Sequence, residues 1–216
     1  MWAVSKPGPR ALEGVLVVII VTLLGPAQSP AASRNESTRT MKNLNAALSA
    51  ERNDHARYLA FAQKADQEGY GAVASLFRAI AAAEEIHQSN HEQTIQRLGG
   101  TAALNLETIE IRSTRENLQA SLDAESYEWG TMYPQFIAQA REDWYVPAAA
   151  SFEKAQRTEE QHVEMLKAVF RNLDSLKGSL ARTYYVCTIC GFTTADLNFD
   201  KCRGCVNPKS KYKVVS

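Results

Sequence analysis

Hydrophobic residues recur every three or four positions along most of the chain from residue 41 to residue 176. This spacing places side chains on one face of an α-helix, and it predicts four helices, at about residues 41–68, 72–98, 112–142 and 147–176. Gly69 and Gly99 follow the first two, where glycine commonly ends a helix. Four long amphipathic helices predict a mainly α protein built as a four-helix bundle. Only the link between the second and third helices, at about residues 99–111, is long enough to cross such a bundle.

A glutamate interrupts the apolar face of each predicted helix. The four are Glu51, Glu84, Glu125 and Glu159, and a histidine follows two of them by three residues, His87 and His162. Residues three apart share a helix face, and the spacings of 33 and 34 residues between paired glutamates indicate a duplicated helix pair. Any one of these glutamates alone could be a solvated surface residue. Unpaired carboxylates in a core are costly, so four in register predict bound cations, in the pattern of di-iron and di-manganese bundles.

Neighbouring residues have other predicted places. His55 and His91 continue the helix faces without a counterpart in the other repeat, and we expect them at the rim of the cluster or just outside it. Glu85 and Glu160 point about 100° away from the cluster, so we expect them on the surface. Trp129 and Met132 are expected to pack in the core.

All four cysteines lie near the C-terminus, as two C-x2-C pairs with eleven residues between them: Cys187, Cys190, Cys202 and Cys205. This spacing predicts a tetrahedral thiolate metal site, with two disulfides as the alternative. Gly191 and Gly204 favour metal-binding knuckles, and iron and zinc both accept four thiolates. The segment is too small to fold on its apolar core alone. We expect that small core to consist of Tyr184, Tyr185, Phe192, Phe199 and Tyr212.

Charge and the N-terminus narrow the class of protein. Lys plus Arg and Asp plus Glu both number 24, which argues against nucleic-acid binding. No apolar run reaches the about 18 residues of a spanning helix, which excludes a polytopic membrane protein. An apolar run at residues 14–24 follows Lys6 and Arg10 and precedes small residues. It predicts a signal peptide at residues 1–32 and export to the periplasm; the alternatives are a membrane anchor at residues 14–24, or a cytoplasmic protein.

The motifs together resemble rubrerythrin. The segments SAERNDHARY, AEEIHQSNHE, DAESYEWGTMYPQF and TEEQHVEML resemble the ligand-bearing helices of that family, and YYVCTICGFTTADLNFDKCRGCVNPKSKY resembles its rubredoxin-like module. The likeness extends from about Leu44 to Tyr212. It implies a ferritin-like di-iron four-helix bundle at residues 40–180 and a rubredoxin-like domain at residues 182–216. The implied cofactors are two Fe ions in a carboxylate-bridged site and one Fe at the cysteines, where Zn is the alternative.

The resemblance also implies a role for each residue of the di-iron site. Glu51 would be a terminal ligand of the first iron, Glu125 and His162 would be terminal ligands of the second, and Glu84 and Glu159 would bridge the two. Glu128 would be the family's additional carboxylate. It would bind the first iron in the oxidised state and give way to His87 in the reduced state. Tyr58 and Tyr133 would donate hydrogen bonds to the ligating carboxylates.

The implied activity is that of a peroxidase which reduces hydrogen peroxide to water in oxidative-stress defence, with electrons relayed through the cysteine-bound iron. The alternatives are a ferroxidase or oxidase, and a non-enzymatic iron- or zinc-binding protein. The implied partners are an unidentified electron donor and a second copy of the chain, in a head-to-tail homodimer whose ribbon serves the partner's bundle. Two features depart from the family: Arg203 replaces the knuckle proline, and export would separate the protein from a pyridine-nucleotide-linked donor.

Overall fold

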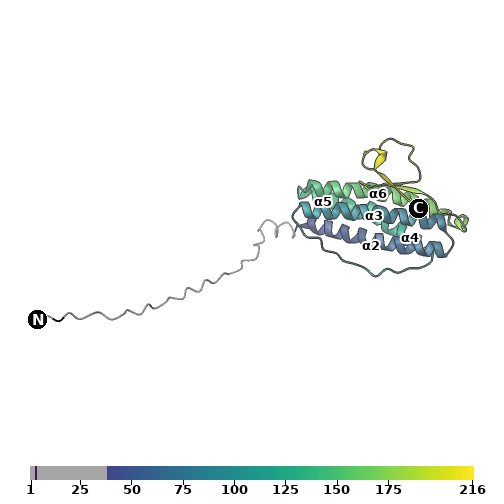
Figure 1. Ribbon diagram of the computed structural model, residues 1–216, viewed down its shortest axis with the longest axis horizontal. Helices are drawn as coiled ribbons and strands as arrows, with labels where there is room; N and C mark the ends of the chain where they lie inside the picture. The colour runs from purple at the N-terminus through teal and green to yellow at the C-terminus, as the bar shows by residue number, and fades with distance from the viewer. Residues whose placement is uncertain (1–2, 4–37) are drawn as a thin grey trace.

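The protein is a bundle of long helices that carries a small C-terminal ribbon (Figure 1). The computed structural model describes residue 3 and residues 38–216. The predicted signal peptide therefore lies outside the described residues, except for residue 3. Within the described part, no helix is long and apolar enough to cross a membrane.

Long α-helices make up most of the described chain. They are α2 (Arg39–Gln67), α3 (Gly71–Arg97), α4 (Thr114–Tyr127), α5 (Tyr133–Glu142) and α6 (Val146–Arg171). The short elements are the π-helix η1 (Glu128–Met132), the 3-10 helices η2 (Leu173–Leu176) and η3 (Lys209–Lys211), and the strands β1 (Tyr184–Cys187), β2 (Thr193–Thr194) and β3 (Tyr212–Val215). The mainly α, ferritin-like fold class predicted from the sequence is confirmed.

The connection between α3 and α4 runs along α2 from one end of the bundle to the other (Figure 1). Polar side chains one helical turn apart on α2 hold its backbone. The amides of Ala103, Asn105 and Glu107 donate to the side-chain oxygens of Asn45, Ser49 and Asn53, respectively. This segment is the predicted crossover, and α4 begins directly after it with a capping box of Ser113 and Glu116.

The third predicted helix is not one continuous α-helix, because the π-helix η1 separates α4 from α5. A π turn contains an additional residue, so it changes which side chains face the core, and such turns are frequent at functional sites. Met132 is buried as predicted. Trp129 is 37% exposed, so its predicted place in the core is wrong.

Two apolar cores fill the bundle, one on each side of the glutamates. Along α2, Leu44 and Leu48 belong to one core and Phe61 to the other. Glu51 lies between them in the chain and is fully buried. The same order holds along α6, where Glu159 separates Phe152 from Leu166. The polar cluster is therefore enclosed by apolar side chains at both ends.

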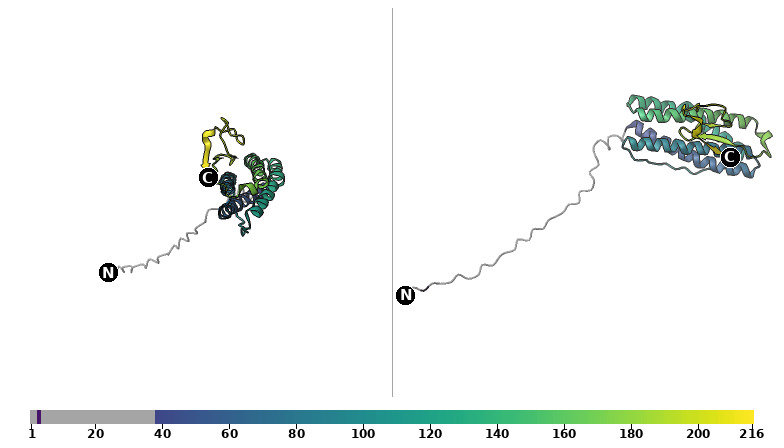
Figure 2. Two further views of the ribbon diagram at one scale, coloured as in Figure 1. Left: turned by 90° about the vertical axis from the view of Figure 1, so that its right-hand side faces the viewer. Right: turned by 45° about the horizontal axis from the view of Figure 1, so that its top comes forward.

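The ribbon is a three-stranded antiparallel sheet in the order β2-β1-β3. It lies against one side of the bundle, over α3 and α6 (Figure 2). Tyr184 packs with the bundle core, whereas the ribbon's own core contains Phe192, Tyr212 and the cysteines. The prediction for Tyr184 is therefore wrong, because β1 lies against α3. Within this chain the ribbon covers its own bundle, which differs from the expectation that it serves a partner's bundle.

Candidate metal centres

The structure brings the predicted carboxylates and histidines of helices α2, α3, α4 and α6 together. These residues form two groups, and within each group the ligand atoms lie within 4.8 Å of one another. The two groups share Glu84 and Glu159. The first group adds Glu51 and His87, and the second adds Glu125 and His162. All six residues are buried. The arrangement provides two adjacent positions for cations with two carboxylates placed between them.

Several of these buried ligand atoms have no hydrogen-bond partner among the described residues. Both carboxylate oxygens of Glu84 and Glu159 lack one, as do one oxygen of Glu125 and Nδ1 of His162. A buried polar atom without a partner costs free energy. These atoms are oxygen and imidazole donors, the ligands that iron and manganese accept. The orphaned atoms therefore fit a pair of metal ions.

The ribbon orients both histidines. His87 Nε2 donates to the carbonyl oxygen of Cys190 at 3.0 Å, and His162 Nε2 lies 3.4 Å from the hydroxyl of Thr193. Each contact directs the histidine's Nδ1 toward the carboxylates, at 2.8 Å from Glu84 for His87 and 2.9 Å from Glu159 for His162. A hydrogen bond on one ring nitrogen fixes the tautomer that leaves the other free to bind a metal.

Two buried tyrosines hydrogen-bond to the outer carboxylates, Glu51 and Glu125, each of which belongs to only one of the two ligand groups. Tyr58 donates to Glu125 Oε1 at 2.5 Å, and Tyr133 donates to Glu51 Oε1. These are the contacts that the resemblance implied. His91 is fully buried beyond Tyr133, with Nε2 3.1 Å from its hydroxyl and Nδ1 2.9 Å from the hydroxyl of Ser151. His91 thus lies just outside the cluster, as predicted. Burial, together with charge on His87, lowers the pKa of His91 to about 3 and keeps it neutral.

Glu128 is close to the cluster but outside both ligand groups. It begins the π-helix and shares a cavity of about 170 Å³ with Asp54, Arg57 and Glu107. Asp54 was not among the predicted site residues, although it lies three residues after Glu51 and so on the same helix face. Asp54 is buried, accepts a hydrogen bond from Arg57 at 2.5 Å, and lines the same cavity as Glu128. Burial raises the pKa of Asp54 to about 7.

The remaining predicted residues lie where they were expected. His55 is partly buried, and its Nδ1 donates to the carbonyl oxygen of Ala81 at 2.7 Å. Glu85 and Glu160 are exposed.

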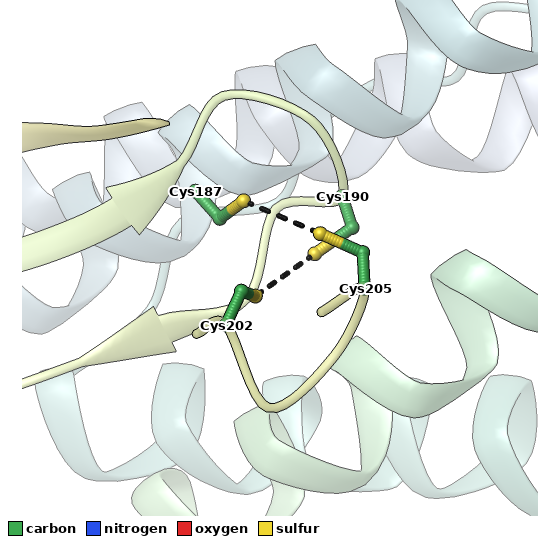
Figure 3. Close-up of side chains that lie close together, drawn as sticks. All are labelled: Cys187, Cys190, Cys202 and Cys205. Carbon is green, nitrogen blue, oxygen red and sulfur yellow. Dashed lines mark hydrogen bonds between the residues drawn. The ribbon is translucent and has the colours of Figure 1, made fainter. Parts of the chain in front are cut away.

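The four cysteine sulfurs form the second centre (Figure 3). The Sγ atoms of Cys187 and Cys205 are 3.7 Å apart, and those of Cys190 and Cys202 are 3.6 Å apart. A disulfide bond is about 2.05 Å long, so the disulfide alternative does not hold here. A tetrahedron with metal–sulfur bonds of about 2.3 Å has edges of about 3.8 Å. The sulfurs therefore fit a single tetrathiolate metal ion.

Side chains also hydrogen-bond to the sulfurs. Tyr212 donates its hydroxyl to Cys202 Sγ at 3.0 Å, and Asn207 donates to Cys205 Sγ at 3.3 Å. The Tyr212 ring packs on the Phe199 ring. The guanidinium of Arg203 lies over the same Phe199 ring, 5.8 Å from its centroid. Arg203, which replaces the family's proline, thus takes part in ordering the loop.

Comparisons with known proteins agree with this geometry. The family model for rubrerythrin matches residues 42–170. Nigerythrin from Nitratidesulfovibrio vulgaris is 32% identical over 183 residues, covering 84% of this chain and 89% of that relative. Rubrerythrin-2 from Clostridium acetobutylicum is 28% identical over 179 residues, covering 82% and 97%. The structure of fully reduced nigerythrin has a TM-score of 0.73 at 30% identity and covers 87% of this chain and 98% of that one.

A helical bundle with a carboxylate–histidine pair of metal positions and an attached tetrathiolate ribbon defines a class of di-iron protein with a rubredoxin-like module. Bacterioferritin from Desulfovibrio desulfuricans, 20% identical with a TM-score of 0.63, shares the bundle fold. The chain itself belongs to the rubrerythrin family. Its cofactors are a di-iron pair at the carboxylates and a rubredoxin-like iron at the cysteines.

Proposed function

We propose that this protein is a peroxidase that reduces hydrogen peroxide to water and acts in oxidative-stress defence. The reaction consumes two electrons and two protons for each peroxide and yields two waters. When bound, the di-iron pair supplies the two electrons together, and the cysteine-bound iron supplies their replacements singly. The observation that carries the proposal is the contact of His87 Nε2 with the Cys190 carbonyl oxygen, which joins the two centres. A protein that only stores iron has no use for such a junction.

The residues around Glu128 suit the entry of a small polar substrate. The cavity shared with Asp54 and Arg57 lies beside Glu128, which at 6% is the most exposed of the candidate di-iron carboxylates. Arg57 also contacts Glu107 on the crossover, so charged groups from two segments line this approach. In this arrangement His87 belongs to a ligand group, whereas Glu128 lies outside both groups and lines the cavity with Asp54. This is the arrangement expected for the reduced site, and we propose that Glu128 and His87 exchange when the site is oxidised.

The optical test needs only the iron-loaded protein. It is reduced without oxygen and mixed with a small excess of hydrogen peroxide, while a second sample is exposed to air. The ferric-thiolate colour should return rapidly with peroxide and slowly in air. A faster return in air would move the assignment to an oxidase or ferroxidase. A colourless protein that holds zinc would support a metal-binding role instead.

The exchange predicts the behaviour of Glu128→Ala. The metal content should stay unchanged because six other ligands remain, while peroxide turnover should fall by at least about tenfold. The matched control is Glu160→Ala, which removes an exposed glutamate of α6. Metal analysis and the peroxide assay would be run on both variants, and wild-type turnover in Glu128→Ala would contradict the exchange.

Two further proposals concern the setting of the protein. We propose export to the periplasm with cleavage after Ala27 or Ala31, and N-terminal sequencing of the mature protein tests it. We also propose a homodimer, and light scattering of the iron-loaded protein gives its mass. In the structure the ribbon already contacts its own bundle, so electron delivery within one chain does not require the dimer.

A further inference from the structure

The two cysteine knuckles of the ribbon are closed in the same way but have different surroundings. The amide after the second cysteine of each pair closes the loop, Gly191 N to Cys187 O at 2.9 Å and Val206 N to Cys202 O at 2.9 Å. Both closing residues have positive φ, 81° and 56°. Gly191 lies directly against the bundle, so that an added Cβ would be 2.6 Å from His87 Nε2. The first knuckle is therefore the side of the ribbon that faces the di-iron site.

The second knuckle faces solvent. Cys205 is the partly exposed cysteine of the four, and Val206 beside it is 73% exposed. A β-branched residue is an outlier in the left-handed region, and Val206 holds that conformation where the first knuckle uses glycine. An exposed apolar side chain kept in a strained conformation beside a metal ligand suggests a contact made with another molecule.

The surroundings of the second knuckle are basic, although the whole chain has no net charge. Residues 184–216 contain five Lys or Arg and two Asp. Lys201, Arg203 and Lys209 are exposed in or beside this loop, where Lys201 pairs with Pro208 in an antiparallel bridge. From the bundle, Arg157 reaches the second knuckle and donates to the Gly204 carbonyl oxygen at 3.4 Å. The opposing charge in the loop is Asp200, which pairs with Lys209 at 3.8 Å.

From this arrangement we infer that the second knuckle is the docking face for an acidic one-electron carrier protein. The face consists of Cys205 and Val206 at its centre and the cations Lys201, Arg203 and Lys209 around them. A ring of basic side chains attracts an acidic partner and raises the association rate. An apolar contact at the centre of the ring then holds the two proteins in one orientation. An iron–sulfur or flavin carrier would pass one electron to the ferric tetrathiolate site here, leaving it ferrous. The inference rests on the proposed function, since two such transfers replace the electrons that each peroxide consumes.

The test uses iron-loaded full-length protein and a reduced plant-type [2Fe–2S] ferredoxin, an acidic carrier whose low potential drives the transfer. Stopped-flow absorption follows the loss of ferric-thiolate colour at increasing salt concentration. The wild-type rate should fall by about tenfold or more as salt screens the charges. The double variant Lys201→Glu, Lys209→Glu should start at least about tenfold slower at low salt and lose this dependence. The matched control is Arg39→Glu, Lys42→Glu, which reverses two exposed cations at the far end of α2 and should behave as wild type.

Val206→Gly separates docking from stability. Glycine relieves the positive φ, so the variant should unfold at the same temperature as wild type or higher. Its reduction by ferredoxin should nevertheless slow about threefold at high salt, where the apolar contact dominates. A residue with only a structural role would not combine these two effects.

Three results would overturn the inference. The first is a docking-face variant that reacts as wild type, and the second is an equal loss in the Arg39, Lys42 control. The third is a change of oligomeric mass in the docking-face variant, which would assign this face to a contact between copies of the chain. Reoxidation of dithionite-reduced protein by peroxide should be the same in all variants. If peroxide does not reoxidise the wild-type protein, the proposed function is refuted. The rate of reduction by ferredoxin would still test the docking face, because it is measured separately.

Discussion

At the scale of single residues, each metal centre depends on hydrogen bonds that reach its ligands from outside. Tyr58 and Tyr133 fix the outer carboxylates, and Cys190 and Thr193 fix the histidines. These partners decide which atom of each ligand faces the metal. Sequence spacing identified the ligands. It could not show that the ribbon supplies the hydrogen-bond partners of both histidines, because His87 and its partner Cys190 lie about 100 residues apart in the chain.

The hydroxyl of Tyr212 gives a prediction at this scale. Hydrogen bonds to thiolates favour the more negative, reduced form of an iron–sulfur site and so raise its reduction potential. Tyr212→Phe removes only the donor to Cys202 and should lower the potential by about 20–60 mV, the equivalent of one net hydrogen bond. A mediated redox titration of the ferric-thiolate band measures this. Tyr185→Phe, on strand β1 of the same ribbon, is the control, and an unchanged potential in Tyr212→Phe would contradict the prediction.

At the scale of elements, the first knuckle and helix α3 form the junction between the two centres. Besides the Cys190 contact with His87, the side chain of Asn90 donates to the Ile189 carbonyl oxygen at 3.1 Å. From α6, the hydroxyl of Thr158 donates to the Cys190 carbonyl oxygen at 2.9 Å. The knuckle is therefore held by two helices, each of which also supplies a histidine to the di-iron site.

Gly191→Ala should open this junction. The added Cβ would collide with His87 Nε2 and lie 3.2 Å from the carbonyl oxygen of Ala83. Peroxide-driven reoxidation of the cysteine-bound iron should slow by at least about tenfold, because the knuckle must move away from His87. Gly99→Ala is a matched control: its φ of 76° imposes similar strain, about 1–2 kcal/mol, but no atom of the described residues lies within 4 Å of the added Cβ. Equal rates in the two variants would mean that the junction does not carry the electrons.

The elements also show how far the sequence could predict the fold and the site. Helical periodicity and the glutamates at matching positions were enough to predict the bundle. The spacing of the cysteines was enough to predict the tetrathiolate centre. Hydrophobic periodicity did not reveal the π-helix at Glu128–Met132, because one added residue shifts a face without removing the pattern. The exposure of Trp129 follows from that shift. Tyr184 was misplaced because periodicity within a strand does not show which neighbouring element covers it.

At the scale of the whole molecule, four helices bring six ionisable ligands into one layer between two apolar cores. Without metal, burial raises the pKa values of Glu51, Glu125 and Glu128 well above their usual range. For His87 and His162, burial alone would lower the pKa, but the surrounding carboxylates raise it. The same histidines, acting against burial, lower the pKa of Glu84 and Glu159. The fold therefore keeps a cluster that is stable only with protons or with metal ions in it.

This balance determines how stability changes with pH. The groups with raised pKa bind more protons in the folded than in the unfolded chain between about pH 5 and pH 8, since unfolded Glu and His titrate near 4.3 and 6.5. Their contribution is present at low pH and lost as pH rises. Glu84 and Glu159 have lowered pKa values, so above about pH 5 they are ionised in both states and their contribution stays constant there.

We therefore expect protein stripped of the di-iron pair, with the cysteine site still loaded, to melt at least about 4 °C lower at about pH 8 than at about pH 5.5. The di-iron form should not show this loss, because metal ions replace the protons and their binding is stronger at higher pH. Thermal unfolding followed by circular dichroism measures both forms. The variant Glu51→Gln, Glu125→Gln removes two of the responsible carboxyls and should flatten the dependence in the stripped protein. A stripped wild-type protein that becomes more stable as pH rises would show that the carboxylate layer does not control the stability of the bundle.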